Sequence, residues 1–213
     1  MIYRENKIPY IFIHNPRTSG TSLEAYLIWR GGKYFLQKHS IYAMISDIDP
    51  SNFYTFGFVR NPFSREVSLY YLHKHVTSID YSFEEWVNKR YVTKEITQYT
   101  GPQYGYFCDV NGQLKAHIFK FEDRERSIDE ISSNLGFPFE QMLHYKAMPQ
   151  RGNFSTKASG DYRSHYTQEL IDIVTPIFQI DMDAFGYDFD GPTNIKKNVT
   201  FKFDVPVTDI TTF

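Results

Sequence analysis

What the chain lacks narrows its function before any motif is considered. Cys108 is the only cysteine, so an intrachain disulfide and a metal site built from several thiolates are both excluded. No apolar run approaches the length that spans a bilayer, and the opening residues, MIYRENK, contain no apolar signal core. We therefore expect no membrane span and a reducing, cytoplasmic location.

Two common catalytic signatures are missing as well. The nucleotide-binding loop GxxxxGK[ST] does not occur, and neither does the nucleophile elbow GxSxG. These absences argue against an ATP- or GTP-hydrolysing enzyme and against a Ser-His-Asp hydrolase.

The chain also lacks a strong net charge of either sign. Its formal charge is −2, so the chain as a whole lacks the positive charge that is typical of nucleic-acid-binding proteins. Residues 14–39 nevertheless carry a net charge of +3, as do residues 146–163. Local positive patches on a mildly acidic protein favour a small polyanionic ligand over a polymer backbone.

What is present predicts a folded α/β protein. The 213 residues are enough for one well-cored domain, and the 41% hydrophobic and 18% aromatic content excludes disorder. We expect an α/β domain over residues 1–190 and a C-terminal tail over 191–213. The alternating NVTFKFDVPV of that tail predicts an edge strand or hairpin, which could pair across a dimer.

The first informative stretch is Ile8–Leu23, IPYIFIHNPRTSGTSL. It predicts a buried strand over residues 10–13, a loop of small residues, and a helix from about Ser22 to Arg30. Small residues at a helix start let backbone N–H groups approach an anion, and Arg17 lies in the same loop. A phosphate cradle is one interpretation, and an ordinary capped helix with a solvated Arg17 is the other.

A second stretch repeats this arrangement. FYTFGFV at 53–59 predicts a strand, followed by a basic turn in which Asn61 suits an N-cap and Pro62 the first helical position. Arg60 and Arg65 again place cations at a helix N-terminus, and the repetition favours an anionic ligand.

Further elements follow from local signals. Residues 116–121 predict a strand, and the capping boxes at Ser82 and Ser127 predict helix starts, the second helix ending at Gly136. A helix over 168–180 is expected after the N-cap Thr167, with Pro176 as a kink or early stop.

Together the two loops resemble the sulfotransferase family that uses 3′-phosphoadenosine-5′-phosphosulfate (PAPS), especially its carbohydrate and heparan/chondroitin-type branch, known as sulfotransferase family 2. That branch shows PKTGGTS and FVRNPxxRxxSxYY; here the stretches read NPRTSGTS at 15–22 and FVRNPFSREVSLYY at 58–71. FKFED, LGFPF, YRSHYT and FGYDF further along are also similar in order and spacing, so the resemblance covers roughly residues 8–189.

The resemblance implies a single-domain, P-loop-like three-layer sandwich with a central parallel sheet flanked by helices. It implies a PAPS-dependent sulfotransferase that releases adenosine 3′,5′-bisphosphate (PAP) and needs no metal. Arg60 and Ser68 would bind the 3′-phosphate, and Arg163 would complete the pocket or simply be surface charge. The 5′-phosphosulfate would be held by the first loop, namely by Arg17, Thr18, Ser19, Gly20, Thr21 and Ser22.

Arg17 stands where the family usually has Lys, and Ser19 where it usually has Gly. An Arg can still stabilise negative charge on the departing bisphosphate, so we assign Arg17 a catalytic role, although it cannot readily give up a proton. We assign the general base to His39, which lies between the two motifs, as catalytic His or acidic residues do in relatives. His14 is the rival base, and Glu122 or Asp123 could also serve.

The acceptor implied by the resemblance is a hydroxyl, most naturally on a saccharide, and Tyr104, Tyr106 and Phe107 would either stack on it or belong to the core. Two other functions stay open. One is a catalytically inactive module that binds PAP or PAPS, and the other is a small-molecule kinase with a variant loop.

Overall fold

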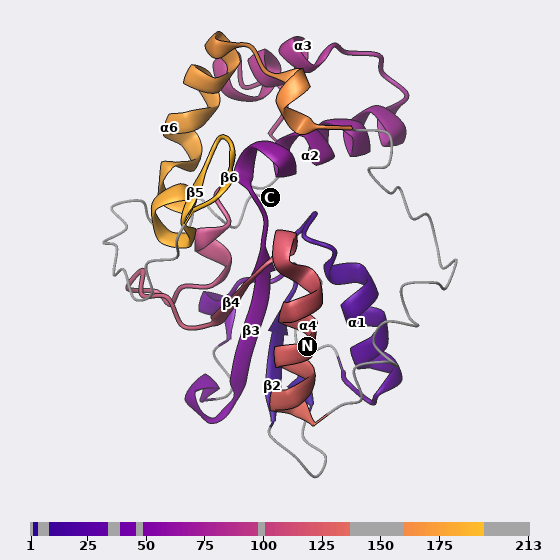
Figure 1. The fold of residues 1–213 in the computed structure, drawn as a ribbon, viewed down its shortest axis with the longest axis vertical. Helices are drawn as coiled ribbons and strands as arrows, with labels where there is room; N and C mark the ends of the chain where they lie inside the picture. The colour runs from indigo at the N-terminus through magenta and orange to yellow at the C-terminus, as the bar shows by residue number, and fades with distance from the viewer. Residues whose placement is uncertain are drawn as a thin grey trace. The chain divides into compact units, whose positions relative to one another are not determined.

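The computed structural model describes residues 2–3, 9–33, 39–45, 49–97, 101–136 and 160–193 (Figure 1). These residues divide between two compact units, which are considered one at a time. Among the described residues, unit 1 comprises 2–3, 9–33, 39–45, 49–60 and 104–136, and unit 2 comprises 61–97, 101–103 and 160–193.

Unit 1 is built on a sheet with the strand order β1-β2-β3-β4. Figure 1 labels β2, β3 and β4 of this sheet. Strands β2, β3 and β4 run parallel, and β1 pairs antiparallel with β2 at the edge. Parallel strands are usually buried on both faces, and all six residues of β3 except Tyr54 are buried. The strands are β1 (Ile2–Tyr3), β2 (Tyr10–Ile13), β3 (Tyr54–Val59) and β4 (His117–Lys120).

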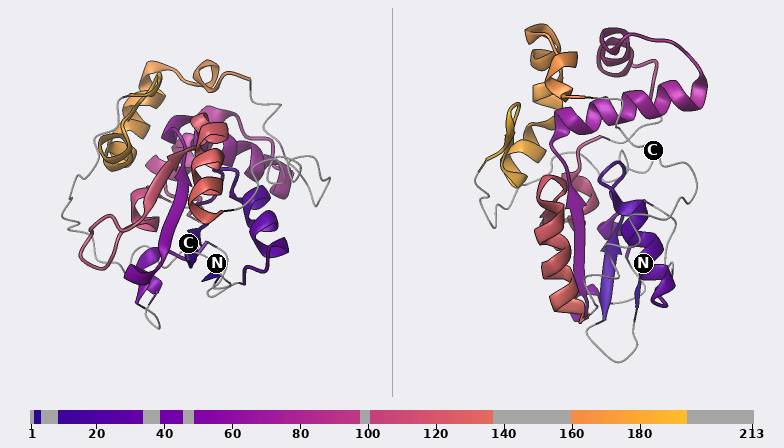
Figure 2. Two further views of the ribbon diagram at one scale, coloured as in Figure 1. Left: turned by 60° about the horizontal axis from the view of Figure 1, so that its bottom comes forward. Right: turned by 45° about the vertical axis from the view of Figure 1, so that its right-hand side comes forward.

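One face of this sheet is aromatic and carries the main core. Phe12 of β2 lies opposite Phe56 of β3, and Phe58 lies opposite Phe119 of β4, so their rings share one face. Helices α1 (Gly20–Trp29) and α4 (Arg124–Leu135) flank the sheet and add mainly aliphatic side chains to the same cluster (Figure 2). The helical contribution is Leu23, Tyr26, Leu27, Ile128, Ile131 and Leu135.

The opposite face of the sheet is covered by the segment of unit 1 that begins at Tyr104. A Cβ built on Gly57 would lie 2.3 Å from a ring carbon of Phe107, so the absence of a side chain lets that ring pack against β3. A 3₁₀ turn over Tyr104–Tyr106 precedes it, and Tyr104 and Phe107 are fully buried. These aromatics belong to the core, which was one of the two alternatives that the sequence left open; the other was stacking on an acceptor.

Cys108 follows directly on this segment. Its side chain is buried, and burial raises the pKa of the thiol to about 11. It is therefore a core residue and not a reactive thiol.

Unit 2 is mainly helical, with a small antiparallel hairpin (Figure 1). Asn61 caps its first helix by accepting hydrogen bonds from the backbone nitrogens of Phe63 and Ser64, at 3.0 and 3.2 Å. The elements are α2 (Pro62–Thr77), α3 (Phe83–Val87) continued by a π-helical turn (Asn88–Val92), a 3₁₀ turn (Tyr162–His165), α6 (Gln168–Phe185), β5 (Tyr187–Asp188) and β6 (Gly191–Pro192).

A buried ion pair holds α2 to the π-helical turn. Nε of Arg90 lies 2.9 Å from Oε1 of Glu66, and both side chains are almost completely buried. The indole of Trp86 and the hydroxyl of Tyr91 each donate to Glu66, at 2.7 Å. Two hydrogen-bond donors together with a guanidinium at ion-pair distance provide the surroundings in which a buried carboxylate is tolerated.

Two predictions of helix limits were wrong. Helix α4 begins at Arg124, so Ser127 is not its cap; the Ser127 hydroxyl instead donates to the backbone oxygen of Asp123, at 2.7 Å. Helix α6 does not stop at Pro176 and continues to Phe185, beyond the predicted end at 180, because Leu170, Val174 and Phe178 form one buried stripe on either side of the proline. The alternative of a kink at Pro176 stays a prediction.

The other predicted strands and helices are confirmed to within a few residues, including the capping box at Ser82. The fold is mixed α/β, with a parallel three-stranded sheet flanked by helices. The alternating part of the tail, Val199–Val205, lies outside the described residues, and the division at residue 190 stays a prediction. In the part of the chain that the structure describes, no helix has both the length and the apolarity needed to cross a bilayer.

Candidate functional site

The first predicted loop lies at the carboxyl end of β2, beside the end of β3. The side-chain nitrogen of Asn15 donates to the backbone oxygen of Phe58 at 3.0 Å, and the Thr18 hydroxyl donates to the backbone oxygen of Asn15 at 2.8 Å. These buried bonds fasten the loop to the sheet. Ligands of parallel α/β sheets bind outside the carboxyl ends of the strands, which is where this loop lies.

The backbone of the loop is strained at two residues. Arg17 and Ser19 have φ angles of +66° and +62°, in the left-handed region that only glycine enters without cost. Ser19 is the N-cap of α1, yet its side chain makes no capping hydrogen bond, and the first turn holds no acidic residue. Strain together with an uncapped N-terminus is the arrangement expected where backbone N–H groups face an anion.

Two arginines flank this helix start. Arg17 is half-buried, and burial lowers the pKa of its guanidinium. Arg60, which directly follows β3, is buried and donates from Nη1 to the backbone oxygen of Arg17 at 3.5 Å. The ring of Phe121 lies under the Arg60 guanidinium, 4.6 Å from its centroid. The structure thus brings both predicted cations to one edge of the sheet.

The side chain of His14 lies against two residues of α1, Gly20 and Glu24. A Cβ on Gly20 would lie 2.3 Å from Cδ2 of His14, so the imidazole packs directly on the glycine. Nδ1 of His14 lies 3.2 Å from Oε1 of Glu24, an ion-pair contact outside hydrogen-bond alignment, and both side chains are 6% exposed. Gly20 and Glu24 are four residues apart, so they share one side of α1.

His39 joins the same site from a separate segment. Its Nδ1 lies 3.0 Å from the backbone oxygen of His14, and the two imidazole rings meet edge to face with centroids 4.6 Å apart. Because a carbonyl oxygen only accepts, Nδ1 of His39 must carry the proton, and Nε2 of the neutral ring is then the acceptor. The structure thus places the predicted base beside the predicted loop.

The remaining first-loop residues are at the start of α1. Gly20, Thr21 and Ser22 form its first turn; Thr21 is exposed and Ser22 is half-buried. The rival acids Glu122 and Asp123 are exposed, in a 3₁₀ turn after β4.

Ser68 and Arg163 belong to unit 2. Ser68 is buried in α2. Arg163 contacts two carboxylates, that of Asp161 at 3.0 Å and that of Asp190 at 3.4 Å, and the hydrogen bond to Asp161 raises the pKa of Arg163. The roles of Ser68 and Arg163 in nucleotide binding stay predictions.

Sequence reasoning missed two buried charges at this sheet edge. The sequence analysis used Glu24 only in the count of charges. Its position four residues after Gly20 could have indicated that the two residues lie on the same face of the predicted helix. Lys120 ends β4 and is 9% exposed, and burial lowers the pKa of its ammonium group. A lysine at the end of a predicted parallel strand is the signal that could have found it. Among the described residues, no group of three or more His, Cys, Asp or Glu could hold a metal ion.

Comparison with known proteins gave one finding. The model of the Sulfotransferase family matches residues 32–188, which is most of the chain; the match includes β3, Arg60 and His39 and begins after the first loop. Searches of curated proteins and of solved structures found no match.

Proposed function

The chain belongs to the sulfotransferase family, and on that premise we propose that it transfers the sulfuryl group of PAPS to an acceptor hydroxyl, with carbohydrate as the acceptor class. The observation that carries the proposal is the meeting of Arg17, Arg60 and an uncapped helix N-terminus at one sheet edge. Such a donor set fits a ligand with several phosphate and sulfate groups.

Each group has a role in the proposed reaction. The first-turn N–H groups of α1 and Arg17 bind the 5′-phosphosulfate, and Arg60 binds the 3′-phosphate with Ser68. The acceptor oxygen forms its bond to sulfur while the bond from sulfur to the phosphate oxygen breaks, and that electron pair stays on PAP. Arg17 neutralises the charge that builds on this oxygen.

His39 takes the proton of the acceptor hydroxyl at Nε2. Its Nδ1–H is directed to the backbone oxygen of His14, so the ring has its acceptor nitrogen on the far side. His39 is exposed, as a base that meets an incoming acceptor must be. General-base catalysis of this kind contributes about 10²–10⁴-fold in rate.

A P-loop-like three-layer sandwich is part of the same proposal. It is supported by the order strand, anion loop, helix at residues 10–29 and by the parallel pairing of β2, β3 and β4.

Nucleotide binding tests the proposal first. Calorimetric titration with PAP, 5′-AMP and ATP should show selective binding of PAP, weakened at least about tenfold in Arg60→Ala, since a charged hydrogen bond to phosphate is worth about 1.5–3 kcal/mol. Arg126→Ala is the matched control, because the Arg126 side chain is 82% exposed. Preference for ATP would support the variant kinase, and no nucleotide binding by folded protein would overturn the proposal.

Turnover then separates an enzyme from a binding module. PAPS is supplied with a panel of saccharides, and the release of PAP is followed in wild type and His39→Ala. A rate in the wild type that falls about 10²-fold or more in the variant is expected for a lost base. Tight binding of PAP without transfer to any hydroxyl would favour an inactive PAP-binding module.

A further inference from the structure

The ring of His39 contacts a backbone atom: its Nδ1 lies 3.0 Å from the backbone oxygen of His14. Whatever fixes the backbone at residue 14 therefore contributes to the position of this ring. His39 itself has a φ of +67°, a left-handed conformation that costs a non-glycine residue energy.

The side chain of His14 is clamped on two sides. Its ring packs on Gly20, where even a methyl group would clash, and its Nδ1 faces the carboxylate of Glu24 at 3.2 Å. Both of these partners lie on α1, whose other contacts anchor it in the aromatic core of unit 1. The clamp therefore ties residue 14 to a rigid helix.

Glu24 is the element of this arrangement that packing alone does not explain. A carboxylate that is 5% exposed carries a large desolvation cost, and a leucine of similar size would fill the same space without it. Glu24 also lies behind a loop that is to bind an anion, where its charge is unfavourable. A positioning role for the carboxylate accounts for its presence there.

We propose that Glu24 and His14 are positioning residues for the base: the carboxylate holds the His14 imidazole on Gly20, and the fixed His14 backbone oxygen keeps His39 in the tautomer with Nε2 as acceptor. This inference rests on the proposed function for its catalytic meaning. The geometric part, the tautomer of His39, is independent of any substrate. An imidazole held in the wrong tautomer can lose up to about 10⁴ in rate, so the orienting group matters.

The tautomer is tested by NMR on ¹⁵N-histidine-labelled protein at a pH where the rings are neutral. Wild-type His39 should carry its proton on Nδ1. In Glu24→Leu, which removes the carboxylate at similar size, His39 should shift toward the Nε2–H form that dominates in free histidine. Glu24→Gln keeps an oxygen beside Nδ1 of His14 at nearly the same size, and should retain the wild-type tautomer of His39. An Nε2–H form of His39 in the wild type, or no change in Glu24→Leu, would overturn the proposal.

Kinetics give the second readout. In Glu24→Leu we expect kcat for sulfuryl transfer to fall about tenfold or more, while the KM for PAPS changes less than about threefold, because base orientation is needed only for the chemical step. A parallel rise in KM and loss of PAP binding would indicate a collapsed loop and contradict a positioning role. If Glu24→Leu does not fold, the tautomers of His14 and His39 in the wild type test the proposal instead. Both rings are expected to carry their proton on Nδ1, and an Nε2–H form of either ring would contradict the proposal. Failure of the proposed function would appear separately, as a wild type that does not bind PAP although the tautomers are as expected.

Discussion

Helices α1 and α2 both start a few residues after a parallel strand, yet their N-termini are built in opposite ways. Asn61 precedes α2 and accepts hydrogen bonds from two backbone nitrogens, and Pro62 occupies the first helical position. Ser19 precedes α1 in a left-handed conformation and makes no capping bond. The start of α2 is capped by a side chain of the chain itself, whereas the start of α1 is strained and has no side-chain cap.

This contrast separates stability from binding. A capped helix start contributes to the folded state in the absence of any partner. A strained, uncapped start lowers stability and returns that energy when an anion binds. Substitutions at α2 should therefore change the free energy of unfolding, and substitutions at α1 should change ligand affinity and rate.

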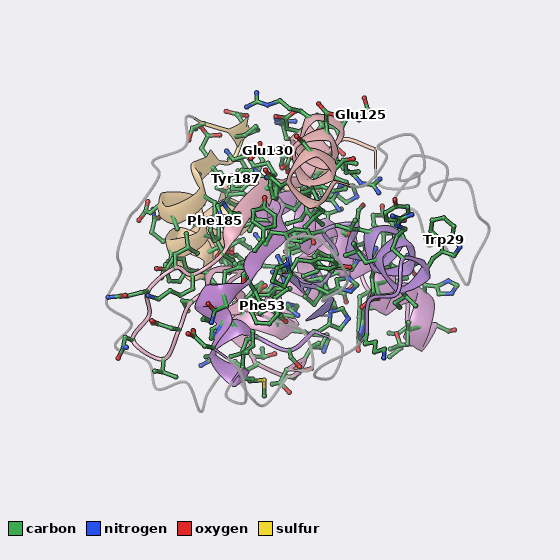
Figure 3. The ribbon with its side chains drawn as sticks, turned by 90° about the horizontal axis from the view of Figure 1, so that it is seen from below. Trp29, Phe53, Glu125, Glu130, Phe185 and Tyr187 are labelled. Atoms are coloured by element: carbon green, nitrogen blue, oxygen red, sulfur yellow. The ribbon has the colours of Figure 1, made fainter. Side chains whose placement is uncertain are left out.

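The largest effect is expected at Arg17. Arg17→Ala should lower kcat for sulfuryl transfer by about 10²–10³, the cost of removing one group that stabilises transition-state charge. Arg30→Ala is the matched control, because Arg30 lies at the opposite end of α1, with its guanidinium over the ring of Trp29. Trp29 is exposed and is labelled in Figure 3. Steady-state rates of PAP release check this, and a change below threefold in Arg17→Ala would remove Arg17 from the mechanism.

Gly20→Ala tests the clamp between the loop and His14. The new Cβ would lie 2.3 Å from the imidazole, so we expect a loss of about 1–3 kcal/mol in the free energy of unfolding and weaker PAP binding. Gly101→Ala is the control, because nothing lies within 4 Å of a Cβ there. Urea denaturation and calorimetry measure both quantities. Equal stability of the two variants would show that His14 does not pack on Gly20 in solution.

Asn61→Ala removes the side chain that caps the N-terminus of α2. Loss of the cap should reduce the free energy of unfolding by about 1 kcal/mol, within a range of 0.5–2 for such caps. The substitution also removes the 2.7 Å hydrogen bond from Asn61 to the backbone oxygen of Asp188, which adds to the loss. Urea denaturation gives the value, with Ser78→Ala at the C-terminal end of α2 as a comparison. An unchanged midpoint would contradict the role of Asn61 as a cap.

Ser19→Gly should have the smallest effect and the opposite sign. Glycine adopts a φ of +62° without steric cost, so we expect a gain of up to about 1 kcal/mol in the free energy of unfolding. Because the side chain of Ser19 makes no capping bond, nothing is lost in exchange. Thermal unfolding with and without PAP measures the gain. A loss of stability would show that the side chain of Ser19 contributes an interaction of its own.

Local features of this molecule could be predicted from the sequence, because short-range chemistry determines them. The Asn61 cap, the capping box at Ser82 and the strands around the two loops follow from residue types and spacing. The early stop considered at Pro176 was wrong because the buried stripe of α6 outweighs the tendency of a proline to end a helix. Ser127 was misjudged because the preceding 3₁₀ turn feeds directly into α4.

The candidate site could be predicted only in part. Arg17, Arg60 and His39 were predicted from motif and resemblance, and the structure adds contacts that each of them makes; their roles stay predictions. The contact of Arg60 with the backbone oxygen of Arg17 joins residues 43 apart, and that of His39 with His14 joins residues 25 apart. No local pattern encodes such pairings. The burial of Glu24 likewise depends on the helix packing against the sheet.

The rate at which Cys108 is alkylated can report how often unit 1 opens transiently. Only the thiolate reacts with an alkylating reagent, and the buried thiol has its pKa raised to about 11, so in the closed state at pH 8 it is almost inert. Labelling then proceeds through transient opening of the segment that packs on β3, and its rate reports the population of the open state when reclosing is fast. Because the chain has no other cysteine, a single mass shift follows this motion without an engineered probe.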